Sequence, residues 1–270
     1  METNVVAEML REGLLVKAIG RRLLFYETLG STMDEAARLA EDGIEEGATI
    51  IVERQTSGRG RFNRPWISTD GNLMLSIVLR PSLYSLRYLS ILAGVATARA
   101  ITKTTGLNPS IKWPNDVRID GKKVGGILVE SSLEGNAVRY TVVGIGINVK
   151  PDSAHTLELM TTATCLDAEI AHPISRQVLL RHILQEGDIL YRELQQGSTP
   201  LDEWRSLLDT LGKMVTVRVM HGAPGSTMEA RTYSGLAEGV DAAGNLVLRT
   251  KAGHRIALSA GEVTLQETIC

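Results

Sequence analysis

Three arginines and two glycines lie within residues 55–66, a segment that contains no acidic residue. Guanidinium groups offer forked donors that match phosphate or carboxylate, and Gly58 and Gly60 allow the backbone to approach an anion closely. Trp66 adds a flat face on which a base could stack. The segment predicts an anion-handling loop, although a solvated basic surface loop would have the same composition. Its arginines are Arg59, Arg61 and Arg64.

Further polar residues follow around two turns. Pro114 ends a strand that starts at Ile111, which places Asn115 and Asp116 at its mouth, a common position for site residues. A lysine beside a hairpin is usually a solvated surface residue, but Lys123 stands next to a glycine pair that lets another group pass close to the backbone. The remaining polar candidates in this part of the chain are Lys112 and Asn148.

Proton-transfer and phosphate-loop motifs are absent from the sequence. There is no Walker loop, dinucleotide fingerprint, nucleophile elbow or metalloprotease motif, and the five histidines lie outside the motif-bearing half. A carboxylate attacking the α-phosphate of ATP needs no base, because it is already ionised at neutral pH. Its obstacle is repulsion of about 4 kcal/mol between like charges 4 Å apart at a dielectric of 20, so arginine, lysine and Mg²⁺ cations are required.

Apolar runs and turn residues predict the elements that position these groups. The arginine loop joins two buried strands, residues 49–52 and 73–79, and a capped helix begins at Ser31 or Thr32, where capping alone would explain both hydroxyls. From residue 212 onward, short alternating runs predict a small antiparallel β-barrel. Other expected strands are residues 23–26, 111–113, 124–130 and 140–149; expected helices are 4–13, 32–42, 86–105, 175–195 and 201–208.

The composition is that of an ordinary globular protein. With 270 residues, 43% of them hydrophobic, the chain has room for one large and one small domain. Its 29 basic and 31 acidic residues argue against a dedicated nucleic-acid binder. Two cysteines, no Cys/His metal spacing, no export signal and no membrane span indicate a reducing cytoplasm.

Four motifs together resemble those of biotin protein ligases: GRGRFNRPW at 58–66, KWPND at 112–116, KVGGILVE at 123–130 and GIGIN at 144–148. The resemblance implies an α+β fold: a class II synthetase-like biotin/lipoyl ligase catalytic domain with a mixed sheet packed with helices, residues 1–209, followed by an SH3-like β-barrel, residues 210–270. It also implies a two-step reaction. Biotin and ATP give biotinoyl-5′-AMP and pyrophosphate, and the adenylate then acylates one lysine of a biotin carboxyl carrier domain.

The resemblance further implies which residues hold the substrates. Residues matching the biotin set are Ser31, Thr32 and Gln55 at the ureido ring, Gly126 and Leu128 at the bicyclic head, and Arg59 where the loop backbone meets the carboxylate. Residues matching the nucleotide set are Arg61 and Arg64 at the phosphate and adenylate, Trp66 and Asn148 at adenine, Lys123 at the reacting groups, and Asn115 and Asp116 near phosphate and metal. Gly58, Gly60, Lys112 and Gly125 complete the binding set, and Arg61, Lys123 and Asp116 form the catalytic group, with Asp116 either binding Mg²⁺ or orienting the acceptor lysine.

Two positions depart from the family pattern. Met33 stands where Asn is frequent, which removes one polar contact to biotin, and Asn63 stands where Gly is frequent, which is tolerable because Asn adopts left-handed backbone readily. The thirty residues before Ser31 are too few for a winged helix, so we expect a ligase that does not bind DNA. Expected partners are biotin, ATP and the carrier domain, with no membrane; a homodimer and the role of the barrel, cap or carrier dock, stay open.

Two rival functions remain. A lipoate or octanoate ligase would use the same acyl-adenylate chemistry on a similar fold. A nucleic-acid or adaptor module would use residues 55–66 as a basic aromatic patch, with salt-sensitive binding. Since no acid lies near the glycine-rich loop in sequence, we also expect it to be mobile when empty and to become ordered on ligand binding.

Overall fold

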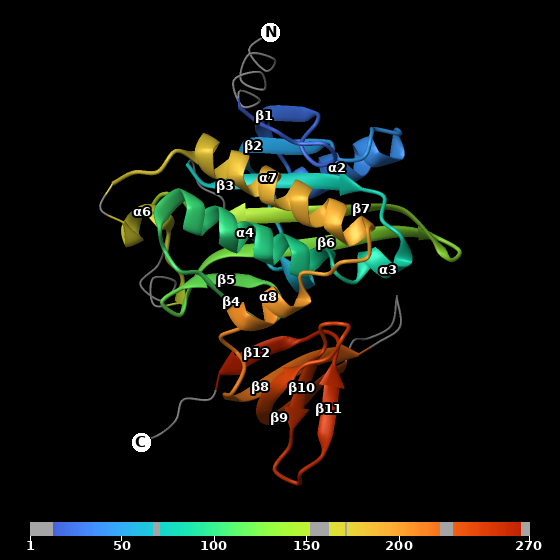
Figure 1. Cartoon of the computed structure of the whole chain (residues 1–270), viewed down its shortest axis with the longest axis vertical. Coiled ribbons are helices and arrows are strands. Elements are labelled where there is room, and N and C mark those ends of the chain that lie inside the picture. Colours follow the sequence, from blue (N-terminus) through green and yellow to red (C-terminus); the bar gives the residue numbers. More distant parts are fainter. Residues whose placement is uncertain (1–12, 67–70, 152–161, 171, 222–228, 266–270) are drawn as a thin grey trace.

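The computed structural model describes residues 13–66, 71–151, 162–170, 172–221 and 229–265. They form a seven-stranded mixed sheet with helices and, after it, a five-stranded antiparallel sheet (Figure 1). The helix expected at residues 4–13 lies outside these ranges except for its last residue.

The larger sheet has the strand order β1-β2-β3-β7-β6-β5-β4, in which only β1 and β2 pair in parallel. The inner strand β3, between β2 and β7, is buried at every position, as its continuous apolar run predicts. Asp120 and Gly121 both have positive φ, at 46° and 78°, as the tight turn between β5 and β6 requires. The strands are β1 (Leu23–Leu29), β2 (Thr49–Gln55), β3 (Leu73–Leu79), β4 (Ser110–Lys112), β5 (Asp116–Ile119), β6 (Lys122–Glu134) and β7 (Ala137–Ile147).

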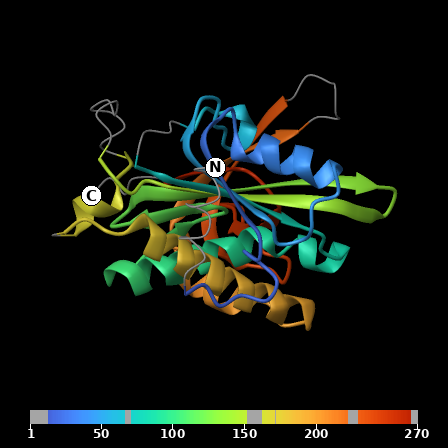
Figure 2. The same ribbon diagram turned by 90° about the horizontal axis from the view of Figure 1, so that it is seen from above.

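Helices cover the two faces of this sheet unequally (Figure 2). The long helices α4 (Leu89–Thr105) and α7 (Arg176–Gln195) pack together on one face with α8 (Leu201–Leu207), while α2 (Thr32–Glu41) lies on the other against β2, β3 and β7. The predicted helix 86–105 begins at Leu89, since a separate turn, α3 (Leu83–Leu86), precedes it; it ends at Gly106, whose φ of 76° is left-handed. A further short helix is α6 (Leu166–Glu169). The sparsely covered face is therefore the one available for a site.

The C-terminal sheet has the order β11-β10-β9-β8-β12. All five predicted strands are present, but β11 and β12 lie at opposite edges and do not pair with each other, so among the described residues the sheet is open where we expected a closed barrel. The alternating pattern specifies strands and antiparallel pairing, but not whether two four-residue edge strands meet. The strands are β8 (Met214–His221), β9 (Glu229–Val240), β10 (Leu246–Arg249), β11 (Arg255–Leu258) and β12 (Glu262–Leu265).

The turn between β9 and β10 joins the two sheets. Tyr88 Oη donates to Ala242 O at 3.0 Å, and the buried Trp113 donates its Nε1 proton to Gly244 O at 3.1 Å. Apolar residues of both sheets belong to one continuous buried cluster. Among the described residues, none of the helices combines the length and apolar character needed to cross a membrane.

Candidate active site

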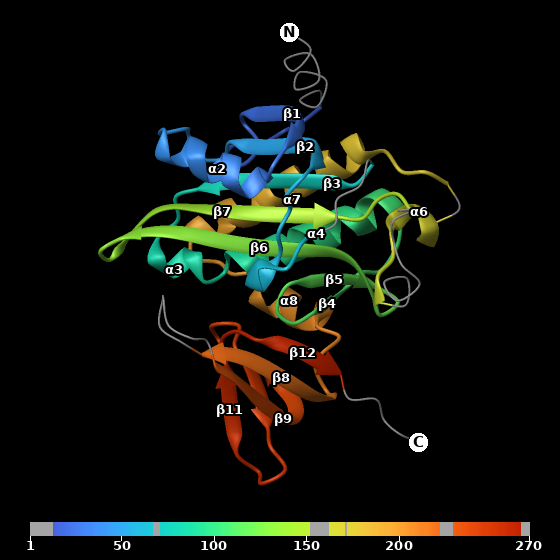
Figure 3. The same cartoon turned by 180° about the vertical axis from the view of Figure 1, so that it is seen from behind.

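A cavity of about 240 Å³ opens on the face of the large sheet that carries α2. Figure 3 shows the 55–66 segment crossing β7 and β6 on this face. Most of the predicted site residues line the cavity: Ser31, Thr32, Gln55, Arg59, Gly60, Arg61, Arg64, Trp66, Lys112, Asn115, Asp116, Lys123, Gly126 and Leu128. Gly58, Gly125 and Asn148 do not.

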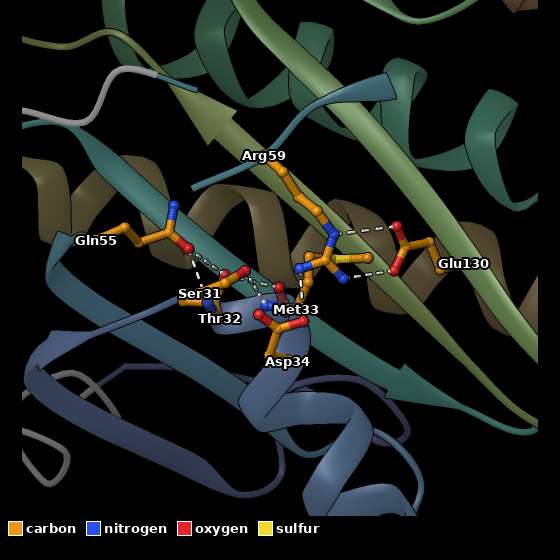
Figure 4. Close-up of polar contacts among 8 residues, drawn as sticks. Ser31, Thr32, Met33, Asp34, Gln55, Arg59 and Glu130 are labelled. Atoms are coloured by element: carbon orange, nitrogen blue, oxygen red, sulfur yellow. Dashed lines mark hydrogen bonds and ion pairs between the residues drawn. The ribbon is translucent and has the colours of Figure 1, made fainter. Parts of the chain in front are cut away.

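At one end of the cavity, polar side chains from three elements form a connected network (Figure 4). Gln55 Oε1 at the end of β2 accepts from the backbone N of Thr32 at 2.7 Å and from Thr32 Oγ1 at 3.1 Å. Ser76 of β3 donates to the same hydroxyl at 2.8 Å, and Ser31 caps α2 by accepting from Met33 N at 3.2 Å. These bonds fix neutral donors and acceptors in a buried cleft, so this end suits an uncharged polar group.

The floor of the cavity is made by glycines of β6 and β7 that stand opposite each other. A Cβ on Gly146 would lie 2.7 Å from Trp66 Cζ2, and one on Gly126 would lie 3.1 Å from Trp66 Cζ3. Two residues before Gly146 on the same strand face, Gly144 would meet Met33 Sδ at 2.5 Å. The floor is therefore flat because these positions lack side chains, and the Trp66 indole lies directly on it.

Cationic groups gather at the other end. Lys123 Nζ lies 2.6 Å from Asp116 Oδ1 and 5.3 Å from the centre of the Trp66 ring. Arg61 Nη1 donates to Asn115 Oδ1 at 3.2 Å and to Gly261 O at 3.1 Å. Burial lowers the pKa of Arg61 and of Lys112 below their ordinary values. This end of the cavity therefore concentrates positive charge away from bulk water and suits a polyanion.

Acidic residues from elsewhere in the chain pair with the outer arginines. Arg59 contacts Asp34 of α2 and Glu130 of β6, and Arg64 forms a bidentate pair with Glu262 of β12. The premise that no acid lies near the loop is therefore wrong. It holds only within residues 55–66 themselves, whereas the fold brings carboxylates to the loop from three distant segments.

The loop backbone also differs from expectation in one place. The left-handed residue is Phe62, with φ of 59°, and Asn63 is not among the described non-glycine residues with positive φ. Gly58 is needed for close packing, because a Cβ there would lie 2.9 Å from both Gln55 Nε2 and Trp66 O. The chain thus places its strained position one residue earlier than the family glycine suggests.

The predicted residues outside the cavity have identifiable structural partners. Asn148, which we expected at adenine, donates from Nδ2 to Thr164 O at 3.1 Å, and its backbone N donates to Val124 O at 2.8 Å. A Cβ on Gly125 would meet Gly146 O at 3.0 Å, which is backbone packing within the sheet.

Several residues that line the cavity were not predicted as site residues. The even spacing of Gly144 and Gly146 on one strand could have indicated a bare strand face. Glu262 had no such signal, because it is 198 residues from its partner Arg64. The unpredicted lining residues include Met33, Met74, Trp113, Gly144, Gly146 and Glu262.

Comparison with known proteins agrees with this geometry. Residues 25–148 match the biotin/lipoate A/B protein ligase family, and residues 226–265 match the biotin protein ligase C-terminal domain. The chain is 36% identical over 262 residues to the bifunctional ligase/repressor BirA of Bacillus subtilis, covering 93% of this chain and 76% of that protein. It belongs to the biotin protein ligase family. The predicted resemblance is thereby confirmed.

Two further relatives support the assignment of this biotin ligase. It is 33% identical to the biotin--[acetyl-CoA-carboxylase] ligase of Paracoccus denitrificans, covering 86% of this chain and 96% of the relative. The biotin protein ligase of Aquifex aeolicus in complex with biotin and ATP has a TM-score of 0.75 and 27% identity, covering 92% of this chain and all of the other. The ligase fold thus extends through nearly the whole chain.

Proposed function

We propose that the cavity binds biotin and ATP, joins them as biotinoyl-5′-AMP with release of pyrophosphate, and then transfers biotin to one lysine of a biotin carboxyl carrier domain. One observation carries the proposal: a single cavity holds a buried neutral network at Ser31, Thr32 and Gln55 and a cationic group at its other end. A ureido ring carries both donors and an acceptor and suits the first, and a triphosphate suits the second.

The neutral network also bears on the lipoate alternative. A dithiolane ring offers no N–H or C=O group, so Thr32 and Gln55 would gain no ligand partner from lipoate. The named relatives of this chain are biotin ligases. Biotin is therefore the favoured acid.

In the first step, a carboxylate oxygen of biotin attacks the α-phosphorus of ATP and the bond to the bridging oxygen of pyrophosphate breaks. The nucleophile is ionised at neutral pH and needs no base. We assign Lys123 and Arg61 to stabilising the charge that gathers where the two anions meet. Arg64 and Lys112 add positive charge around the phosphates, and Trp66 provides an apolar wall beside them.

In the second step, the neutral amine of the carrier lysine attacks the carbonyl carbon of the mixed anhydride and AMP leaves. The amine nitrogen forms an amide bond and loses a proton to water. The Lys123–Asp116 pair lies in the cavity where the adenylate would be formed, and Lys123 can neutralise the departing phosphate. Orientation of the incoming amine is the second role open to Asp116.

Mg²⁺ is a further part of the proposal. Mg²⁺ is usually held by one or two carboxylates together with substrate phosphates and water. The described residues contain no group of three or more His, Cys, Asp or Glu that could hold a metal. Asp116 pairs with Lys123 and Asn115 accepts from Arg61, so the Asp116 carboxylate would be the main protein ligand of a site completed by ATP phosphates and water. Bound there, the ion would neutralise phosphate charge.

The decisive experiment detects covalent attachment of labelled biotin to a carrier domain. The purified chain is incubated with labelled biotin, ATP and a carrier domain, and the labelled residue is located by peptide mass spectrometry. We expect label on one lysine, dependent on ATP and absent from a carrier in which that lysine is Arg. Labelling by lipoate or octanoate in place of biotin, or no label with any acid, would overturn the proposal.

The remaining features are proposed with it. We propose a catalytic domain of residues 1–209 and an SH3-like domain of residues 210–270, and action in the cytoplasm. We also propose no DNA binding, with a homodimer compatible with the function. The near balance of 29 basic and 31 acidic residues supports the absence of nucleic-acid binding. Tight binding of DNA or RNA in a low-salt filter assay would contradict it and would favour the adaptor alternative.

A further inference from the structure

Arg59 connects three elements at the edge of the cavity. Its Nη1 lies 2.5 Å from Asp34 Oδ1 in the first turn of α2, and its Nη2 lies 2.8 Å from Glu130 Oε2 on β6. Its Nε adds a longer bond of 3.4 Å to Glu130 Oε1. Figure 4 shows the guanidinium between the two carboxylates, with Met33 beside it. The side chain thus ties the loop to both the helix and the strand that border the cavity.

The loop behind Arg59 is bonded to itself. Gly60 N donates to Arg64 O at 2.8 Å, and Trp66 N donates to Gly58 O at 2.9 Å. These bonds join the two arms of the loop, so Arg59 and Trp66 belong to one hydrogen-bonded unit. Fixing the guanidinium therefore also fixes the indole on the glycine floor.

Neither acid is needed to bind an anion in the cavity. Asp34 and Glu130 do not line the cavity, and their side chains are 63% and 46% exposed, while Arg59 is 24% exposed. The hydrogen bond to Glu130 is the main cause of a raised pKa for Arg59. The charge of Arg59 is thus already neutralised before any ligand binds.

We propose that Asp34 and Glu130 are positioning residues that, through Arg59, hold the loop closed over the cavity and slow the escape of biotin and of biotinoyl-5′-AMP. The second half of this inference rests on the proposed function, whereas closure of the empty loop does not. The Arg59 side chain links α2 to β6 through its two ion pairs. The backbone around Arg59 is then available to bind the biotin carboxylate.

The expected effects are modest, because exposed ion pairs contribute little. A pair of this kind is worth up to about 1 kcal/mol, or about fivefold. We expect Asp34→Asn and Glu130→Gln each to speed the dissociation of biotin about threefold, and the double variant about tenfold. Arg59→Lys can pair with only one acid at a time and should resemble a single variant.

Hydrogen exchange of the ligand-free protein tests closure without any assumption about activity. The loop amides of residues 56–66 should exchange faster in the double variant, and in each single variant to a smaller degree. Matched controls are Asp42→Asn at the C-cap of α2, which pairs with Arg38, and Glu134→Gln at the end of β6. Unchanged exchange in the double variant, or equal effects in the controls, would overturn the proposal.

Kinetics then separate positioning from general damage. We expect KM for biotin to rise with the dissociation rate, while kcat for pyrophosphate exchange and KM for ATP stay within twofold. Release of free biotinoyl-5′-AMP, measured without a carrier, should rise by the same factor. An equal fall in kcat would overturn the positioning role, and failure of the wild-type chain to use biotin would instead overturn the proposed function.

Discussion

Adding a single methyl group at Gly146 should damage the site through Trp66. A Cβ there would lie 2.7 Å from Trp66 Cζ2 and 2.8 Å from Cε2. Carbon atoms pack at about 3.5–4.0 Å, so the indole of a Gly146→Ala variant must retreat by roughly 1 Å. The ring is rigid and lies on the glycine floor beside Lys123, whose Nζ is 5.3 Å from the ring centre, so the displacement reaches the cationic group.

A misplacement of about 1 Å can cost about 100-fold in rate, which corresponds to about 2.7 kcal/mol of transition-state stabilisation. We therefore expect kcat/KM for biotin-dependent ATP–pyrophosphate exchange to fall about 100-fold in Gly146→Ala. Overpacking itself costs about 1–3 kcal/mol of stability, so thermal unfolding must show that the variant is folded at the assay temperature.

Two further variants isolate the cause. Gly144→Ala adds the same atom on the same strand face, but the new Cβ meets Met33 Sδ, which belongs to a flexible side chain that can rotate away. The fall in kcat/KM of this variant should therefore stay under about tenfold. In a Trp66→Phe background, where the outer part of the ring is gone, Gly146→Ala should lower kcat/KM by under about fivefold. An equal cost in both backgrounds, or no cost in the wild-type background, would refute the reasoning.

Other predictions concern charge and the loop. Arg61→Ala and Lys123→Ala should each slow adenylate formation about 100- to 1000-fold with the fold intact by circular dichroism, because each removes a charge that stabilises the transition state; unchanged exchange rates would contradict these roles. The hydrogen bond from Arg64 lowers the pKa of Glu262. The contribution of this ion pair to the free energy of unfolding is therefore fully present above the unfolded pKa of about 4.3 and is lost as pH falls through the folded pKa. Below about pH 4.3 the free energy of unfolding in urea should therefore fall less with acid in Glu262→Gln than in wild type. The difference should be under about 1 kcal/mol because Arg64 is 61% exposed; parallel curves of unfolding free energy against pH would count against this. Residues 56–66 should also gain further hydrogen-exchange protection with biotin and ATP, because bound ligands add contacts to those that Arg59 already makes; equal protection with and without ligands would contradict this expectation.

Turn and cap residues made much of the fold predictable. The Asp120-Gly121 turn, the helix end at Gly106 and the capped start of α2 all lie where the sequence places them. The apolar strands on both sides of the arginine loop are also confirmed. These features succeed because glycine conformation, capping and hydrophobic periodicity act over a few residues.

The sequence by itself therefore determined that a cationic, glycine-rich loop would join two buried strands beside a second cluster of polar residues. Only the tertiary structure decided which groups meet it: Arg59 finds acids 25 and 71 residues away, and Arg64 finds Glu262 after 198 residues. It also decided that Trp66 lies on Gly146 and that the C-terminal sheet is open. Local patterns cannot specify such contacts, because strand order and domain packing set the distance between residues far apart in the chain.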